Sequence, residues 1–146
     1  MTVGRNYLLL LLLIVSLVQL QMLSQQRGEY RVRDFEETLH INIESIEEVE
    51  MSNFDGNYVQ TKQDEIIKDL INYLGNFQYK RLVNDETSYM PLKTRMIYFH
   101  GEGMSSFMIP YGNEVMIDNR VYVVKEGPME DDFFVSIYTE MIEREK

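Results

Sequence analysis

The stretch RMIYFHGEGMSSFMIPYGNEVMIDNRVYVVK, residues 95–125, decides the fold. It contains four short runs of β-forming residues, at Arg95–His100, Ser105–Ile109, Glu114–Ile117 and Val121–Lys125. The sequences Gly-Glu-Gly, Pro-Tyr-Gly-Asn and Asp-Asn-Arg separate these runs. Such connections are typical of hairpins, because Gly, Asn and Asp tolerate the backbone angles of tight turns. The pattern predicts four consecutive antiparallel strands.

Amphipathic helices are predicted on both sides of this stretch. A helix before it has a candidate N-cap at Thr61 and a candidate C-terminal glycine at Gly75. A helix after it begins at Asp131. The apolar stripes are Ile66, Ile67, Leu70, Ile71 and Leu74 in the first helix, and Phe133, Phe134, Ile137, Tyr138, Met141 and Ile142 in the second.

Further strands are predicted at Leu39–Ile43, Ile46–Phe54 and Phe77–Val83. The residues 53–57 supply turn chemistry, and a polar loop is expected at 84–91. Strands, a helix, more strands and a final helix predict the α+β class. We therefore expect an antiparallel β-sheet packed by two amphipathic helices, preceded by an N-terminal transmembrane or signal helix.

An apolar segment occupies the start of the chain, from Tyr7 to Leu23, and includes Leu8, Leu13 and Val18. No charged residue lies among the 21 residues between Arg5 and Arg27. A helix needs about 20 residues to cross the hydrocarbon core, so this segment predicts a membrane anchor. The expected organisation is an anchor or signal segment at 1–27, a tether at 28–38 and one domain at 39–146.

A secretory signal peptide has the same ingredients, but signal peptidase requires small residues one and three positions before the cut. Met22 and Ile14 occupy the outer position before the cuts that Ser24 and Ser16 would allow. We therefore expect an uncleaved single-pass anchor with the domain outside the cell, ahead of a secreted form and of a cytoplasmic domain. The arginines after the segment, Arg27, Arg31 and Arg33, run against the positive-inside rule.

The charge of the domain excludes nucleic acid as a partner. From Gly28 onward, 12 Lys and Arg face 24 Asp and Glu, a difference of −12. Phosphate backbones require neutralisation by Lys and Arg. Cysteine is absent from the sequence, which rules out disulfides, thiolate metal sites and a cysteine nucleophile.

Catalytic and metal-binding motifs are not evident, and no cofactor is expected. The two histidines, His40 and His100, lack the spacing of a zinc site. The run His100-Gly-Glu-Gly-Met-Ser-Ser106 superficially resembles an oxyanion loop followed by a serine nucleophile. A hairpin is the favoured explanation, because the sequence has no GxSxG elbow and the domain is too short for an α/β-hydrolase. A calcium loop is suggested at Asn53, Asp55, Asn57 and Asp64, although Tyr58 replaces the required glycine.

One basic spot is a candidate contact for a protein partner. It comprises Lys80, Arg81, Lys93 and Arg95, which flank the loop that carries Tyr89. Solvation of sheet edges is the alternative explanation for these charges. The tyrosines Tyr89 and Tyr111 are candidate contacts or caps of the core.

The layout of the chain resembles a family of small uncharacterised Firmicutes proteins that carry one N-terminal apolar segment. The resemblance lies in a strand at Ile46–Met51, a helix at Gln63–Leu74, a hairpin at Val115–Val124 and a helix at Phe133–Met141. It implies a Gram-positive, cell-surface setting and assigns no functional residue.

These observations predict a membrane-anchored extracytoplasmic protein with a non-enzymatic interaction or regulatory domain. Its partners would be the membrane, through the N-terminal helix, and a protein. The alternative is a small extracellular hydrolase or ligand-binding protein whose site is scattered over the sheet. Convergence of His40, His100 and carboxylates in one pocket would favour that alternative.

Overall fold

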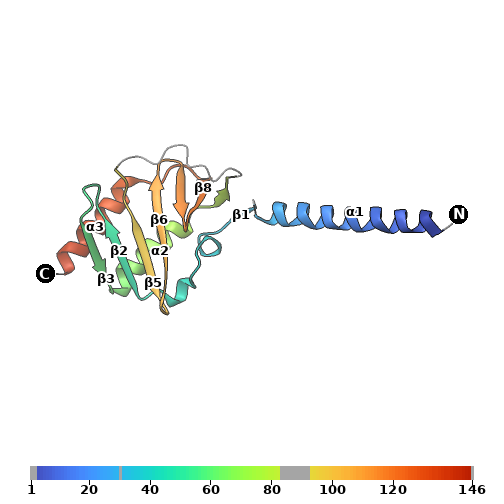
Figure 1. Ribbon diagram of the computed structural model, residues 1–146. Coiled ribbons are helices and arrows are strands. Elements are labelled where there is room, and N and C mark those ends of the chain that lie inside the picture. Colours follow the sequence, from blue (N-terminus) through green and yellow to red (C-terminus); the bar gives the residue numbers. More distant parts are fainter. Residues whose placement is uncertain (1–2, 30, 83–92, 146) are drawn as a thin grey trace. The chain divides into compact units, whose positions relative to one another are not determined.

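The computed structural model describes residues 3–29, 31–82 and 93–145 and divides the chain into two compact units (Figure 1). The first unit, Met1–Arg31, contains helix α1, Val3–Glu29. The second unit, Val32–Lys146, is the folded domain. The domain therefore starts before the predicted boundary at Leu39. The loop predicted at 84–91, with Tyr89, lies outside the described residues.

Helix α1 exposes its apolar side chains. Those of Tyr7, Leu13, Val18 and Leu23 are between 46% and 69% exposed. The side chain of Leu8 lies outside those that the structure describes. Among the described residues, no helix combines the length and the apolar character that a membrane span requires.

The domain is built on one antiparallel sheet of eight strands in the described part of the chain. Their spatial order is β1-β4-β8-β7-β6-β5-β2-β3. The strands are β1 Val32–Arg33, β2 Glu48–Ser52, β3 Tyr58–Thr61, β4 Tyr79–Arg81, β5 Ile97–Gly101, β6 Met104–Tyr111, β7 Glu114–Ile117 and β8 Arg120–Val124. The four strands predicted from residues 95–125 are confirmed as β5 to β8, and the α+β class is confirmed with them.

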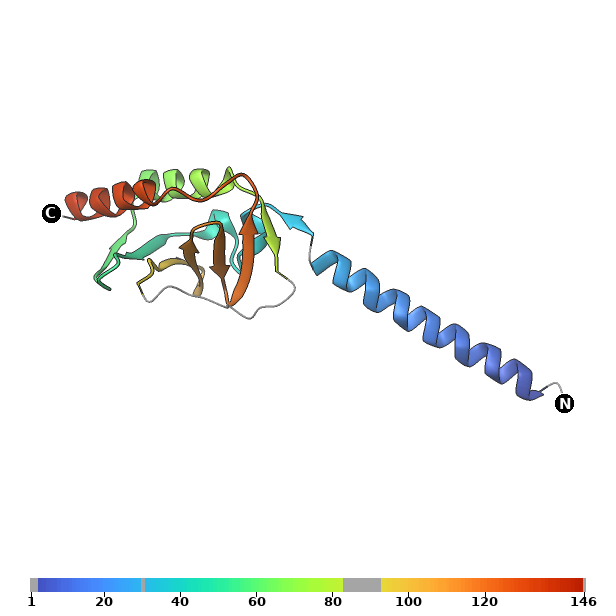
Figure 2. The ribbon, with the colours of Figure 1, turned by 90° about the horizontal axis from the view of Figure 1, so that it is seen from above.

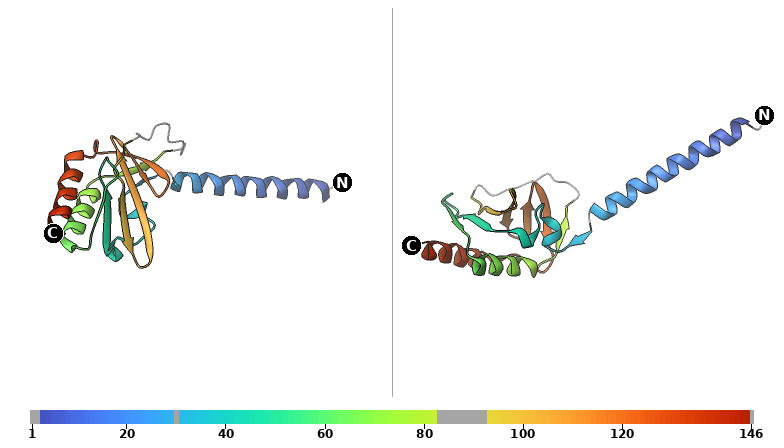
Figure 3. Two further views of the ribbon diagram at one scale, coloured as in Figure 1. Left: turned by 60° about the vertical axis from the view of Figure 1, so that its left-hand side comes forward. Right: turned by 90° about the horizontal axis from the view of Figure 1, so that it is seen from below.

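Helices α2, Asp64–Gly75, and α3, Asp131–Arg144, cover the same face of this sheet (Figures 2 and 3). Both helices were predicted, but their caps differ from the prediction. Thr61 is the last residue of β3, and Gln63 is the N-cap of α2. The Thr61 hydroxyl accepts from the backbone N–H of Gln63 at 3.2 Å. Asn76 caps the other end of α2 in a right-handed conformation, so Gly75 is helical.

The segment before β2 differs most from the sequence prediction. Residues Leu39–Ile43 do not form a strand. They lead from one short 3₁₀ turn, Glu36–Thr38, into a second, Ile43–Ser45. Leu39 and Ile41 are buried alternately because they pack against the sheet from outside its hydrogen-bonded ladder. The predicted tether at 28–38 also contains part of the core, since Phe35 is buried.

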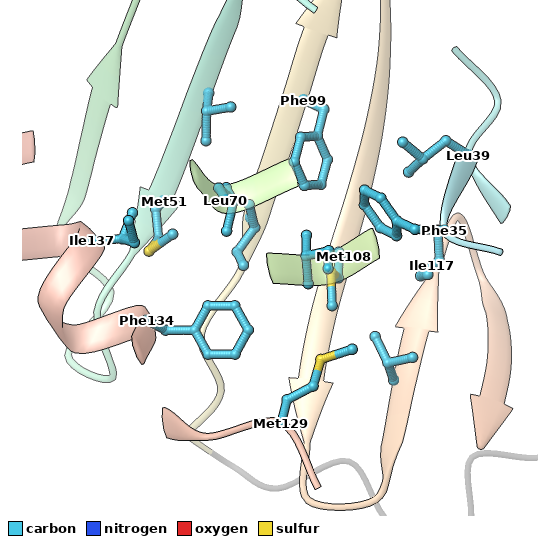
Figure 4. Close-up of a cluster of buried hydrophobic side chains, with 14 of the residues drawn as sticks. Phe35, Leu39, Met51, Leu70, Phe99, Met108, Ile117, Met129, Phe134 and Ile137 are labelled. Carbon is cyan, nitrogen blue, oxygen red and sulfur yellow. The ribbon is translucent and has the colours of Figure 1, made fainter. Parts of the chain in front are cut away.

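The main core lies between the sheet and the helices (Figure 4). Phe35 supplies its end away from α3, with its ring centroid 5.8 Å from that of Tyr79 and 5.7 Å from that of Phe99. Burial raises the pKa of Tyr79 well above its ordinary value, and its hydroxyl donates to the Leu74 carbonyl at 2.8 Å. The labelled core residues in Figure 4 include Met51, Leu70, Met108, Ile117, Phe134 and Ile137.

The opposite side of the sheet, covered by neither α2 nor α3, is called the outer face. Successive residues of a strand point to opposite sides of the sheet. The residues that come directly before and after a core residue in a strand therefore lie on the outer face. A second buried cluster on this face comprises Ile109, Met116 and Val121. Next to it, Tyr98 and Phe107 are directly opposite each other on β5 and β6.

We predict that Gly101→Ala destabilises the domain by about 2 kcal/mol, because overpacked sites typically cost about 1–3 kcal/mol. A Cβ at Gly101 would overlap the backbone carbonyl of Ser45. Urea unfolding of the full chain, followed by near-ultraviolet circular dichroism of the buried tyrosines, measures this effect.

The matched control is Gly75→Ala, whose added Cβ would meet no atom within 4 Å. Alanine is favoured over glycine in helices by about 1 kcal/mol, so this variant should be as stable as the parent or more stable. Equal unfolding midpoints for Gly101→Ala and the parent would contradict the close approach of Gly101 to Ser45.

Candidate functional site

The two histidines contact neighbouring serines of strand β6 from opposite sides of the sheet. The adjacent residues Ser105 and Ser106 are paired with His100 and Phe99 of β5, respectively, and Phe99 belongs to the core. His100 therefore lies with Ser105 on the outer face, where its Nδ1 is 2.7 Å from the Ser105 Oγ. His40 is held near Ser106 on the other face. The two histidines do not share a pocket.

Ser106 is the centre of a buried hydrogen-bond network. Its hydroxyl donates to the Asp118 Oδ2 at 2.7 Å and accepts from the His40 backbone N–H at 3.0 Å. The same carboxylate accepts from the backbone N–H groups of His40, at 3.2 Å, and Phe107, at 2.9 Å. Ser106 is 1% exposed. Because the backbone of His40 donates to both Ser106 and Asp118, this network ties the segment before β2 to the sheet.

The imidazole of His40 takes little part in that network. Its Nδ1 lies 3.6 Å from the Asp118 Oδ2, and more than half of its side chain is exposed. A nucleophilic serine needs an adjacent base within hydrogen-bond reach. Ser106 does not meet this condition, because the backbone of His40, rather than its ring, contacts it. Ser105 does have a base within reach, since the Nδ1 of His100 lies 2.7 Å from its Oγ. The hairpin interpretation of residues 100–106 is confirmed, since Glu102 and Gly103 have the positive φ of a tight turn.

The suggested calcium loop is a β-hairpin turn. The Asn53 Oδ1 accepts from the backbone N–H groups of Asp55 and Asn57, at 3.0 and 2.9 Å. Asp64 lies beyond the whole of strand β3, at the start of α2. Within the described residues, no group of three or more His, Asp or Glu is placed to hold a metal ion.

The predicted basic spot does not assemble. Arg95 is only 3% exposed, with its Nη2 3.4 Å from the Asp131 Oδ1 and its guanidinium carbon 4.9 Å from the centre of the Phe54 ring. The prediction that Arg95 is a surface contact is therefore wrong, because a sequence pattern cannot reveal a carboxylate supplied by α3. Lys93 is exposed and lies 3.8 Å from Asp55.

Lys80 and Arg81 lie far from Lys93 in the sheet. They belong to β4, which four strands separate from β2 and its turn with Asp55. Successive residues of a strand face opposite sides, so Lys80 and Arg81 do not share a surface either. The four predicted contact residues that the structure describes, which are Lys80, Arg81, Lys93 and Arg95, therefore form no common site.

One cavity has a volume of about 480 Å³. It lies where the start of α3 meets the turns β2–β3 and β6–β7, and Tyr111 and Lys93 are on its wall. Met129 and Phe134 contribute buried apolar surface to it. Of the sequence-predicted contacts that the structure describes, Lys93 and Tyr111 lie at this cavity.

A group that sequence reasoning missed lies on the outer face of β3, β2, β5 and β6. Glu50, paired with Tyr98 in the ladder, is central to it. Ring centroids are 6.4 Å apart for Tyr58 and Tyr98, and 6.2 Å apart for Tyr98 and Phe107. The His100 ring is parallel to that of Tyr98, and its Nε2 lies 3.6 Å from the Glu50 Oε2. We call these five residues the aromatic–acid surface.

The electrostatics of this surface centre on Tyr98 and Glu50. Desolvation raises the pKa of Tyr98, and the nearby Tyr58 and Glu50 raise it further. The alternation of Tyr98 and His100 with Ile97 and Phe99 was the signal in the sequence. It indicated two unlike faces of a strand, but it could not reveal that Glu50 and Tyr58 lie beside them.

Comparison with known proteins gives no relative to compare with this site. The chain matches no protein-family model, no curated protein and no solved structure. The resemblance to small Firmicutes proteins stays a prediction.

We predict that Ser106→Ala destabilises the domain by about 1.5–3 kcal/mol, the usual worth of a hydrogen bond to a charged group. Asp118 and the His40 N–H would both lose the hydroxyl. Urea unfolding measures the loss. Ser105→Ala, on the outer face, is the control and should change stability by less than about 0.5 kcal/mol. Equal effects of the two substitutions would contradict a buried network at Ser106.

Proposed function

We propose that this protein is a membrane-anchored, extracytoplasmic interaction domain without enzymatic activity, which binds a protein partner through the outer face of its sheet. The observation that carries this proposal is the aromatic–acid surface. Tyr58 is 50% exposed on the sheet and lies next to Tyr98, whose ring in turn lies next to that of Phe107. Aromatic residues are enriched at protein interfaces because they bury a large area at a small cost in entropy.

The sheet also supports this proposal, because helices α2 and α3 cover one of its faces and not the other (Figure 3). The outer face carries the exposed ring of Tyr58 on β3 and the partly exposed rings of Tyr98 on β5 and Phe107 on β6. Contiguous exposed apolar surface on a folded domain is typical of interaction sites. Strands position such side chains more rigidly than loops do.

Membrane anchoring is proposed from helix α1 and its sequence. The 21 residues between Arg5 and Arg27 are uncharged. The hydroxyls of Ser16 and Ser24 donate to carbonyls of their own helix, at 2.7 and 2.9 Å. Hydroxyls satisfied in this way do not need water, which suits an apolar environment. A secreted form after cleavage is the alternative.

Small-ligand binding is a second candidate function, favoured by the cavity beside the start of α3. Its volume, about 480 Å³, falls within the range of ligand pockets, about 300–1,000 Å³. Its wall combines the aromatic Phe54 and Phe134 with the charged Lys93 and Asp131. The hydrolase alternative lacks the expected convergence of the two histidines, because His40 and His100 lie on opposite sides of the sheet. Its remaining support is that His100 lies 2.7 Å from the Ser105 Oγ and 3.6 Å from the Glu50 Oε2.

We predict that protease treatment of intact Gram-positive cells expressing the full chain releases peptides from residues 39–146. Mass spectrometry of the cell-associated remainder should recover the uncleaved N-terminal segment, because Met22 and Ile14 disfavour signal-peptidase cleavage. Lysed cells provide the control for protease susceptibility. Domain peptides that survive in intact cells but not in lysed cells would place the domain in the cytoplasm, and a mature N-terminus near residue 25 would establish a secreted form.

We predict that a photo-crosslinking amino acid at Gln60 captures a discrete protein partner on the cells. Gln60 is exposed on β3 and opposite Glu50 in the ladder. The same amino acid at Lys68, exposed on α2, is the control. The crosslink from position 60 should disappear when Tyr98→Ala is added, with folding checked by near-ultraviolet circular dichroism. Identical products from positions 60 and 68 would argue against binding at the outer face.

A further inference from the structure

The aromatic–acid surface has the composition of a cation-binding surface. The faces of aromatic rings attract cations, and the attraction is strongest when a carboxylate lies nearby and water is partly excluded. Tyr58 and Tyr98 have ring centroids 6.4 Å apart and are tilted by 43°. Glu50 belongs to β2, the strand between them, because β2 pairs with β3 on one side and with β5 on the other. Two rings and one carboxylate thus converge.

Glu50 has unused capacity to bind a cation. Its described ion-pair partner is the Nε2 of His100, at 3.6 Å, which is longer than a charge-assisted hydrogen bond of about 2.7–2.9 Å. His100 uses its other ring nitrogen closely, at 2.7 Å from the Ser105 Oγ. Glu50 remains 32% exposed. An incoming cation could therefore reach the Glu50 carboxylate without first breaking a short ion pair.

The surroundings are acidic as well. A shallow cavity of about 180 Å³ is lined by Glu50, Tyr58, Gln60 and Glu145. On the same face, Glu48 is already paired with Lys62, at 3.2 Å. The domain carries 24 acidic against 12 basic residues from Gly28 onward. Charge complementarity favours a basic partner and disfavours an anionic one.

We propose that the aromatic–acid surface binds a Lys- or Arg-bearing segment of the protein partner, with one cationic side chain seated against Tyr58, Tyr98 and the Glu50 carboxylate. This inference rests on the proposed interaction function and specifies the chemistry of its partner. An apolar partner would bury the Glu50 carboxylate without supplying a charge to pair with it, which costs free energy. A cationic side chain satisfies the carboxylate and uses the ring faces together.

The test uses the full chain in non-ionic detergent micelles and a fluorescein-labelled nine-residue peptide. The peptide has arginine at three alternate positions and glycine or serine elsewhere. A second peptide carries citrulline, which is neutral and has nearly the same shape, in place of each arginine. Fluorescence anisotropy at low ionic strength gives the dissociation constants. The arginine peptide should bind at least about tenfold more tightly than the citrulline peptide, as a charge-assisted contact predicts.

Variants separate the proposed site from diffuse acidity. Glu50→Gln should weaken arginine-peptide binding about tenfold, and Tyr58→Leu should weaken it about threefold through loss of a cation–π contact. Asp69→Asn is the matched control, because it removes one charge from the exposed side of α2. Its effect should stay below about twofold, as expected for a distant screened charge.

Two results would overturn the inference. One is equal binding of the arginine and citrulline peptides. The other is an equal loss of affinity for Asp69→Asn and Glu50→Gln, which would mean that only the net charge attracts the peptide. A position-60 crosslink without a preference for arginine would leave the proposed function standing and remove the cationic partner. Arginine-specific binding without that crosslink would support the cation-binding chemistry of the surface and contradict the proposed binding of a protein partner there.

Discussion

The register between strands β5 and β6 is the constraint on which the rest of the domain depends. It pairs Phe99 with Ser106 on the side of the helices and Tyr98 with Phe107 on the outer face. A shift by one residue would exchange the two sets, because side chains alternate with a period of two. The Glu102-Gly103 turn resists such a shift, since it joins the strands with positive φ at both residues.

This register also determines how the segment before β2 joins the domain. Ser106 lies on the side of the helices and so can reach Asp118 at the β7–β8 turn and the backbone of His40. A carboxylate that accepts several hydrogen bonds at a buried position specifies one arrangement, because any other would leave it unpaired. Phe35 then closes the core between the rings of Tyr79 and Phe99.

The same alternation places Ser105 and Ser106 on opposite sides of the sheet and gathers aromatic and acidic side chains on the outer face. Ser105 and Ser106 are neighbours in the sequence but contact different histidines. Ser105 contacts the ring of His100 on the outer face, and Ser106 accepts from the backbone of His40 on the side of the helices. On the outer face, three strands contribute Tyr58, Glu50 and Tyr98 to one area. Geometry of this kind supports recognition by a rigid surface, in which affinity comes from pre-organised contacts.

The sequence by itself determined the local elements of this protein. Hairpin turns, apolar periodicity and acidic first turns placed β5 to β8, α2 and α3 close to their observed bounds, because these signals depend on residues a few positions apart. Alternation alone was misleading at Leu39–Ile43, where burial against the sheet mimics a strand. Strand β3 and the buried Phe35 were not predicted, because their positions depend on residues in other parts of the chain.

Only the tertiary structure decided which side chains meet. Arg95 is buried because α3 brings Asp131 to it, and the aromatic–acid surface exists because β2 inserts between β3 and β5. These neighbours are separated by tens of residues along the chain, as Glu50 and Tyr98 are. Strand order follows from long-range pairing and from packing against the helices, which a local pattern does not encode. The elements were therefore legible in the sequence, and the surface that they build was not.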